Sequence, residues 1–146
     1  MFDAKFSMAG NPEVHHLVDE LKEERSQVWG LYCRIAELKP MYDSQAIRPI
    51  LSDFLQLLID YVSLGHFGVY ERLLSDPHQV GKLAYAEKIY PAFSTTTHSV
   101  ISFNERYNNT LRRFKTDALA QDLSVLGEQL AQRMELEDDL CSMLLH

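Results

Sequence analysis

The chain of 146 residues has few cysteines and no long hydrophobic run. Cys33 and Cys141 lie far apart, and neither belongs to a CxxC pair that would predict a zinc or redox site. We therefore expect reduced thiols and a cytoplasmic location. The N-terminal segment lacks the basic flank and apolar stretch of a secretory signal, and no apolar segment approaches the length that spans a bilayer. No association with a membrane is expected.

Basic residues are also in the minority. The sequence has 14 Lys and Arg residues against 21 Asp and Glu residues, which gives a net charge of -7. Proteins that bind nucleic acid directly neutralise phosphates with Lys and Arg side chains, so direct DNA binding is not expected. An acidic surface instead favours a basic protein partner.

The sequence motifs of common enzymes are missing. There is no P-loop, no GxGxxG, no GxSxG and no HExxH. Glu13 and His16 form one possible metal-binding pair, whereas a carboxylate di-iron bundle needs two such pairs and further glutamates. His98 lies at a mid-helix position that a phosphotransfer bundle could use, but no supporting pattern surrounds it. We therefore expect no enzymatic activity, no cofactor and no metal centre.

Helical spacing of apolar residues occurs almost throughout, and no segment alternates as a half-buried strand does. Pro12, after the cap residue Asn11, predicts the start of a first helix that ends at Pro40. Further helices are expected from residues 44–49 to Gly65, after the cap at 76–77, and over about 117–144. Pro91 should kink or divide the helix that follows the cap at 76–77. We predict an all-α fold with an antiparallel four-helix-bundle core and additional short or kinked helices. Residues 1–10 would be a flexible arm and 11–146 one domain.

The segment "LLIDYVSLGHFGVYERLL", residues 57–74, carries polar side chains inside an apolar run. Asp60 and Ser63 are expected to point inward, and together with His66 they could form one hydrogen-bonded cluster. Glu137 falls on the apolar stripe of the last helix, so it should be buried as well. A buried carboxylate must be paired or must bind something. The sequence therefore leaves open a structural network or a ligand-linked site.

The same segment resembles a known protein family. "LIDYVSLGHFGVYERL" is similar to the signature of the Rsd/AlgQ family, and "ELKP", "KIYP" and "RMELEDDL" match further family segments in the same order. The resemblance spans roughly residues 14–140. The residues that it singles out are Asp60, Tyr61, Ser63, Gly65, His66, Phe67, Tyr70, Glu71, Leu136, Glu137 and Asp138.

This resemblance implies a regulator of transcription. Such a protein would hold the C-terminal region of the housekeeping sigma factor, the part that reads the -35 promoter element, and limit its use by RNA polymerase. Trp29, Tyr32 and Phe67 are candidate aromatic anchors for this partner, although each could equally belong to the core. A homodimer in the absence of sigma is possible. The chain ends soon after Asp138, so contacts that a longer tail would make are not expected.

The polar residues also leave an alternative function open. Asp60, His66 and Glu137 could line one cavity in a helical bundle that senses a metal or a small ligand. This alternative requires the three side chains to face one another in the folded chain. The sigma-binding function instead requires them only to shape the bundle.

Overall fold

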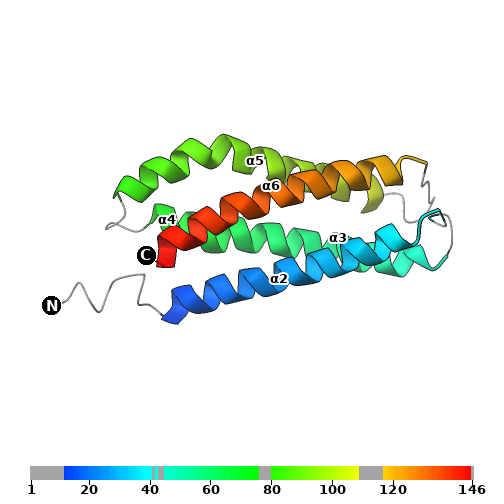
Figure 1. The fold of residues 1–146 in the computed structure, drawn as a ribbon, viewed down its shortest axis with the longest axis horizontal. Helices are drawn as coiled ribbons and strands as arrows, with labels where there is room; N and C mark the ends of the chain where they lie inside the picture. Colours follow the sequence, from blue (N-terminus) through cyan, green and yellow to red (C-terminus); the bar gives the residue numbers. More distant parts are fainter. Residues whose placement is uncertain (1–11, 41, 43–44, 76–79, 109–116, 146) are drawn as a thin grey trace.

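The computed structural model describes residues 12–40, 42, 45–75, 80–108 and 117–145. Within these ranges the chain forms helices and no strand. The four long helices are α2 (Pro12–Glu37), α3 (Ile47–Ser63), α5 (Val80–Asn108) and α6 (Leu119–Leu145), while η2 (Leu64–Tyr70) and α4 (Glu71–Leu74) extend α3. Successive long helices run in opposite directions (Figure 1). The predicted all-α antiparallel bundle is therefore confirmed. The predicted arm at residues 1–10 lies outside the described residues.

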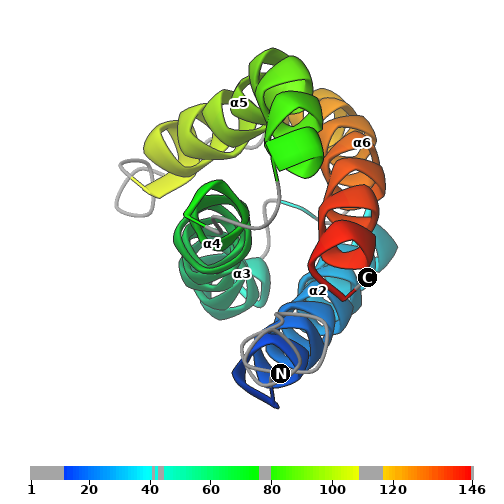
Figure 2. The ribbon, with the colours of Figure 1, turned by 90° about the vertical axis from the view of Figure 1, so that its left-hand side faces the viewer.

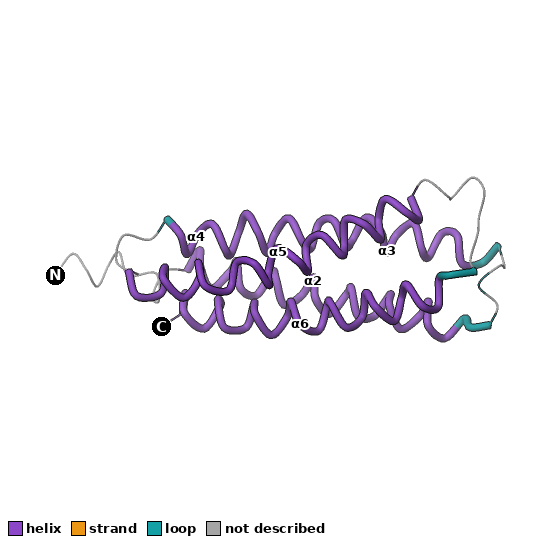
Figure 3. Tube along the Cα trace, turned by 90° about the horizontal axis from the view of Figure 1, so that it is seen from above, coloured by secondary structure: helices purple, strands orange, loops and turns teal. Residues whose placement is uncertain are grey.

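The helices enclose one core. α2 packs against α3 and α6, and α5 packs against the same two helices from the opposite corner (Figure 2). Seen from above, the helices lie side by side along most of their length (Figure 3). None of the described helices is long and apolar enough to cross a membrane.

The core follows from the spacing of apolar side chains at three and four residues. On α6 this spacing buries a stripe that is mostly leucine, interrupted by Arg133, Met134 and Glu137. The buried leucines are Leu119, Leu123, Leu126, Leu130, Leu140 and Leu144. They meet fully buried side chains such as Leu58 of α3 and Phe93 of α5. The bundle therefore closes around a continuous apolar interior.

Prolines set the start of two helices. Pro12 is the first residue of α2, where a proline loses no helical hydrogen bond. α3 begins at Ile47, so Pro49 falls in the first turn, where its missing N–H is again harmless. The expected cap at residues 76–77 lies outside the described residues.

Pro91 does not divide α5, which is helical from Val80 to Asn108. The helix changes direction near its middle (Figure 2). Three threonine hydroxyls donate to main-chain carbonyls here, from Thr95 to Pro91 at 2.9 Å, from Thr96 to Phe93 at 2.6 Å and from Thr97 to Phe93 at 3.2 Å. A proline ring and such back-bonding both bend a helix without ending it.

Candidate functional site

A fully buried ionic network lies under the signature segment. Arg133 and Glu137 of α6 are both 0% exposed, and Nε of Arg133 donates to Oε2 of Glu137 at 3.1 Å. The hydroxyl of Tyr61 in α3 donates to Oε1 of the same carboxylate at 2.5 Å. Burial raises the pKa of Glu137, while Arg133 and the Tyr61 hydrogen bond act in the opposite direction. The carboxylate is thus paired on both oxygens.

The Arg133 guanidinium connects α6 to two other helices. Its Nη1 donates to the hydroxyls of Thr96 and Thr97 on α5, at 3.1 and 2.6 Å. Its Nη2 donates to the carbonyl of Val62 on α3 at 3.3 Å. Phe93 covers the guanidinium, with 4.0 Å from Cζ to the ring centroid. Hydrogen bonds to this many partners allow a cation to remain buried.

The signature segment passes over this network as a π-helix. The N–H of Glu71 bonds to the carbonyl of His66, a spacing of five residues in place of four. A Cβ atom on Gly65 would lie 2.9 Å from Oε2 of Glu137 and 3.1 Å from Nη2 of Arg133. Glycine is therefore required for the close approach of η2 to the buried ion pair.

The outer face of η2 presents aromatic side chains. Phe67 is 65% exposed. His66 is half-buried, makes an edge contact with Phe67 at 4.9 Å between ring centroids, and stacks on Tyr70 at 6.0 Å. Tyr70 is buried, and its hydroxyl donates to the carbonyl of Ala86 at 3.2 Å. Nε2 of His66 lies 3.9 Å from Oε1 of the exposed Glu71.

Two residues expected to point inward do not. Asp60 and Ser63 are both exposed, and the carboxylate of Asp60 accepts a hydrogen bond from the Gln56 amide at 3.1 Å. The buried stripe of α3 runs through Leu58, Tyr61 and Val62, which leaves Asp60 on the outer side of the helix. Apolar neighbours in sequence therefore did not imply burial, and the residue that meets Glu137 is Tyr61.

The alternative cavity of Asp60, His66 and Glu137 is not formed. Asp60 is exposed whereas Glu137 is completely buried against Tyr61 and Arg133. In the part of the chain that the structure describes, no three His, Cys, Asp or Glu side chains are placed to hold a metal ion. The three side chains predicted for a metal or small-ligand sensor thus do not come together.

Three other predicted residues lie elsewhere on the bundle. Asp138 is exposed and forms an ion pair with Arg25 at 2.6 Å. Trp29 and Tyr32 are half-buried and pack against the core. The Trp29 indole donates to Sδ of Met134 at 2.9 Å, and the Tyr32 hydroxyl donates to the carbonyl of Leu123 at 2.9 Å. Their role as partner anchors stays a prediction.

The burial of Arg133 was not predicted from the sequence. A signal for its burial was present, because the leucines of α6 at positions 119, 126 and 140 mark every seventh residue and 133 falls in that series. Because a charged side chain is normally expected at the surface, position 133 was not assigned to the buried stripe. Thr96, which completes the network, has no comparable signal.

A groove of about 550 Å³ surrounds Phe67. The N-terminal half of α2 contributes Glu13 and Glu20, and α4 contributes Glu71. An ion pair from Arg72 to Glu13, at 3.1 Å, joins the two sides. The groove thus combines an exposed aromatic ring with several carboxylates.

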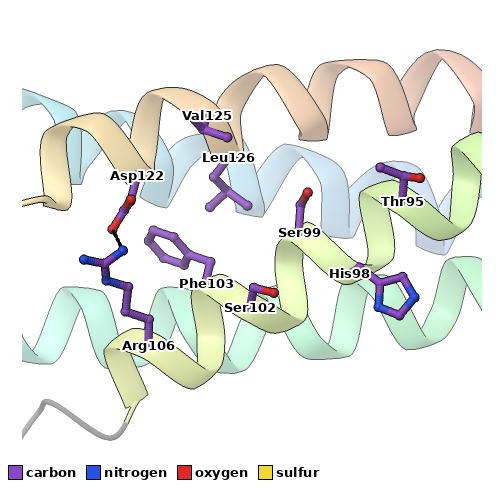
Figure 4. A pocket seen from close by; sticks show the side chains of 9 residues that line it. All are labelled: Thr95, His98, Ser99, Ser102, Phe103, Arg106, Asp122, Val125 and Leu126. Carbon is purple, nitrogen blue, oxygen red and sulfur yellow. Dashed lines mark ion pairs between the residues drawn. The ribbon is translucent and has the colours of Figure 1, made fainter.

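A second hollow, of about 370 Å³, lies between α5 and α6 (Figure 4). His98, Ser102 and Arg106 line it from α5, and Asp122 and Val125 from α6. The Arg106 guanidinium pairs with Asp122 at 3.1 Å. Because that carboxylate neutralises the cation, the hollow has no excess positive charge with which to hold a phosphate group.

The comparisons with known proteins agree on one family. A family model described as "Regulator of RNA polymerase sigma(70) subunit, Rsd/AlgQ" matches residues 7–145. A "Regulator of sigma D" from Yersinia enterocolitica is 30% identical over 131 residues, which cover 86% of this chain and 78% of the relative. Another from Shigella dysenteriae is 33% identical over 132 residues, covering 88% and 84%. No solved structure matches significantly. The chain therefore belongs to the Rsd/AlgQ family of regulators of the RNA polymerase sigma(70) subunit.

Proposed function

We propose that this protein binds the C-terminal region of the housekeeping sigma factor and thereby limits its use by RNA polymerase. Membership of the Rsd/AlgQ family supports a regulator of sigma(70). The observation that carries the finer proposal is the groove around Phe67, where an exposed aromatic ring is flanked by carboxylates. Such a surface fits a basic module that reads DNA.

Exposed apolar side chains gather on the η2 side of the bundle. Phe67, Leu74 and Tyr90 are large hydrophobic residues with exposed side chains. The first lines the groove of about 550 Å³ and the other two line a neighbouring groove, and Glu71 lines both. Aromatic side chains exposed at a concave surface are the usual anchors of a protein interface.

Charge favours the same partner. The sigma C-terminal region contacts DNA phosphates and must therefore carry Lys and Arg side chains. Glu20 and Glu71 would meet these cations at the rim of the groove, whereas Glu13 is already paired with Arg72. A protein held there would compete with DNA for the same basic surface.

The buried network has a separate role in this proposal. Arg133 and Glu137 tie the C-terminal end of α3 to α5 and α6, and η2, which continues α3, carries Phe67 on its outer face. The ion pair does not touch the partner. It fixes the position of the segment that does.

The test is binding of the isolated sigma C-terminal region to the full chain, measured by calorimetry. Phe67→Ala should weaken the complex by roughly tenfold or more, as expected for a central aromatic anchor. Val125→Ala is a matched control, because Val125 is 47% exposed but lies in the hollow between α5 and α6. We expect this variant to bind as the unmodified chain does.

Two results would contradict the proposal. If the unmodified chain does not bind the isolated C-terminal region, the partner region is wrong. If Phe67→Ala and Val125→Ala bind equally well, the partner does not use the groove around Phe67.

A further inference from the structure

A groove of about 440 Å³ lies beside Phe67, between the signature segment and α5. The sigma-binding proposal above does not assign it a ligand. Six side chains line it: His66, Tyr70, Glu71, Leu74, Glu87 and Tyr90. Three are aromatic and two are carboxylates, a combination that favours an organic cation.

The aromatic rings form one continuous wall. Tyr90 packs on Tyr70 with 5.4 Å between ring centroids, and Tyr70 stacks on His66 at 6.0 Å. Tyr70 is buried, whereas Tyr90 is 42% exposed. Tyr90 therefore offers ring surface to a ligand, and Tyr70 supports it from behind.

The carboxylates supply negative charge at this wall. Glu71 is within 3.9 Å of the His66 ring nitrogen. Glu87 is exposed, and no ion pair involving it is found in the described part of the chain. Glu87 lines the same groove as Tyr70 and Tyr90, so its carboxylate lies on the side of the wall that a ligand would meet.

We infer that this groove binds an arginine side chain of the sigma C-terminal region, with its guanidinium stacked on Tyr90 and paired with Glu87. The inference rests on the proposed function and specifies the contact that would add selectivity to it. A guanidinium is planar and can stack on a ring while it donates to a carboxylate in its own plane. A lysine ammonium is more strongly hydrated and lacks this geometry, so arginine fits the site better.

One partner surface can use both grooves. Glu71 lines this groove and also the groove around Phe67, so the two are adjacent. A helix that covers Phe67 could therefore extend one long side chain toward Tyr90. A long side chain reaches such a neighbouring pocket with its apolar stem against Leu74.

The first experiment compares two substitutions of Tyr90 in the full chain. Tyr90→Phe keeps the ring face, and Tyr90→Leu removes it while keeping bulk. We expect Tyr90→Leu to weaken binding of the isolated sigma C-terminal region by about threefold to thirtyfold, the range of a cation–π contact. Tyr90→Phe should change it by no more than about twofold. Circular dichroism checks that both variants fold.

The second experiment isolates the local charge of Glu87. Glu87→Gln and Glu105→Gln each remove one exposed carboxylate of α5, at opposite ends of the helix. Both therefore change the net charge equally. Glu87→Gln should weaken binding by about tenfold relative to Glu105→Gln, because only Glu87 would form a charge-assisted hydrogen bond to the partner.

A double-mutant cycle identifies the arginine. Each surface arginine of the sigma C-terminal region is replaced by lysine and tested against Tyr90→Leu, and one position should show coupling. Equal affinities for Tyr90→Leu and Tyr90→Phe, or for Glu87→Gln and Glu105→Gln, would overturn the inference while wild-type binding still supports the proposed function. Absence of coupling at every arginine would overturn it as well.

Discussion

At the scale of single residues, Arg133 joins three helices of the bundle. It is fully buried, and its hydrogen-bond partners lie on three helices: Glu137 on its own helix, Val62 on α3, and Thr96 and Thr97 on α5. Pairing a buried charge offsets its loss of hydration only when every donor is used. The network is therefore better understood as a device that specifies geometry than as a large source of stability.

Arg133→Met should destabilise the fold strongly. The change leaves the Glu137 carboxylate buried with one partner lost, which costs on the order of 3–5 kcal/mol in the free energy of unfolding. Arg106→Met is the control, since Arg106 is mostly exposed and its pair with Asp122 contributes about 1 kcal/mol or less. Urea unfolding measures both. The double variant Arg133→Met with Glu137→Leu should regain much of the loss, and equal effects of the two single substitutions would contradict this account.

Cys141 predicts a dependence of stability on alkaline pH. Burial, followed by the charge of Glu137, raises the pKa of its thiol to about 11. The folded-state pKa lies above the unfolded value of roughly 8.5, so the contribution of Cys141 is complete below that pH and is lost as the pH rises to 11. The unfolding free energy of the wild type relative to Cys141→Ala should thus fall by roughly 2–3 kcal/mol across this interval. Titrations in urea at several pH values measure it.

The comparison with Cys141→Ala cancels the titration of the tyrosines, which both proteins share. Cys33→Ala controls for the loss of a thiol, because Cys33 is exposed. A wild-type advantage over Cys141→Ala that stays constant from pH 8 to 11 would show that the thiol is hydrated in the folded state.

Sequence reasoning succeeded for Glu137 and failed for Asp60 for the same physical reason. A residue's side of a helix is set by its register with the apolar stripe and not by the polarity of its neighbours. Glu137 was placed by register, and it is fully buried. Asp60 was placed by its apolar surroundings, and it is exposed. Applied to α6 throughout, the register would also have found Arg133.

At the scale of elements, the candidate site differs from an ordinary pair of packed helices because it contains the seven-residue π-helix η2. A π-helical spacing turns successive side chains by a different angle than an α-helix does. Gly65 and Val69 face the interior, and Phe67 faces outward between them. π-helical segments are frequent at functional sites.

Gly65→Ala should disturb this segment. The added Cβ would meet Glu137 and Arg133, both of which are held by hydrogen bonds and cannot yield, so we expect a loss of roughly 1–3 kcal/mol in unfolding free energy. Gly30→Ala is the matched control. Its Cβ would meet nothing within 4 Å on α2, and the change should stabilise the helix by roughly 0.5–1 kcal/mol.

The same two variants test whether the segment positions the partner surface. At a temperature where both remain folded, Gly65→Ala should bind the sigma C-terminal region more weakly and Gly30→Ala should bind it normally. If a folded Gly65→Ala protein binds as tightly as the unmodified chain, η2 does not position the partner surface.

The elements differ in how far sequence could predict them. Apolar spacing and the prolines at 12 and 49 predict where the long helices lie, because both act locally. The helix that was expected to run to Gly65 instead continues as η2 to Tyr70. Whether a helix shifts to five-residue hydrogen bonds depends on what packs against it, here the Arg133 and Glu137 pair from a distant helix. This contact exists only in the folded chain, so the local sequence of η2 could not predict it.

At the scale of the whole molecule, the bundle combines an apolar interior with a surplus of surface carboxylates. The chain carries a net charge of -7, and several acidic side chains surround Phe67. The antiparallel fold follows from four amphipathic helices joined by short connections, and sequence could predict it. Which end of the bundle binds a partner depends on the three-dimensional grouping of exposed rings and charges, so sequence reasoning alone could not locate it.

The surplus negative charge predicts a salt-dependent rate of association. Long-range attraction to a basic sigma region raises the association rate at low ionic strength and is screened at high ionic strength. Between about 50 and 500 mM NaCl the association rate constant should fall by roughly tenfold or more, while the dissociation rate changes much less. Stopped-flow or surface-based kinetics with the isolated sigma C-terminal region measure both constants.

Two variants separate total charge from local charge. Glu20→Lys alters the groove around Phe67, and Glu105→Lys makes the same change in net charge near the far end of α5. If only total charge steered the partner, both would slow association equally. We expect a larger effect of Glu20→Lys on association and an added increase in dissociation, because Glu20 would contact the bound partner. A rate insensitive to salt in all three proteins would mean that apolar contact at Phe67, and not charge, selects the partner.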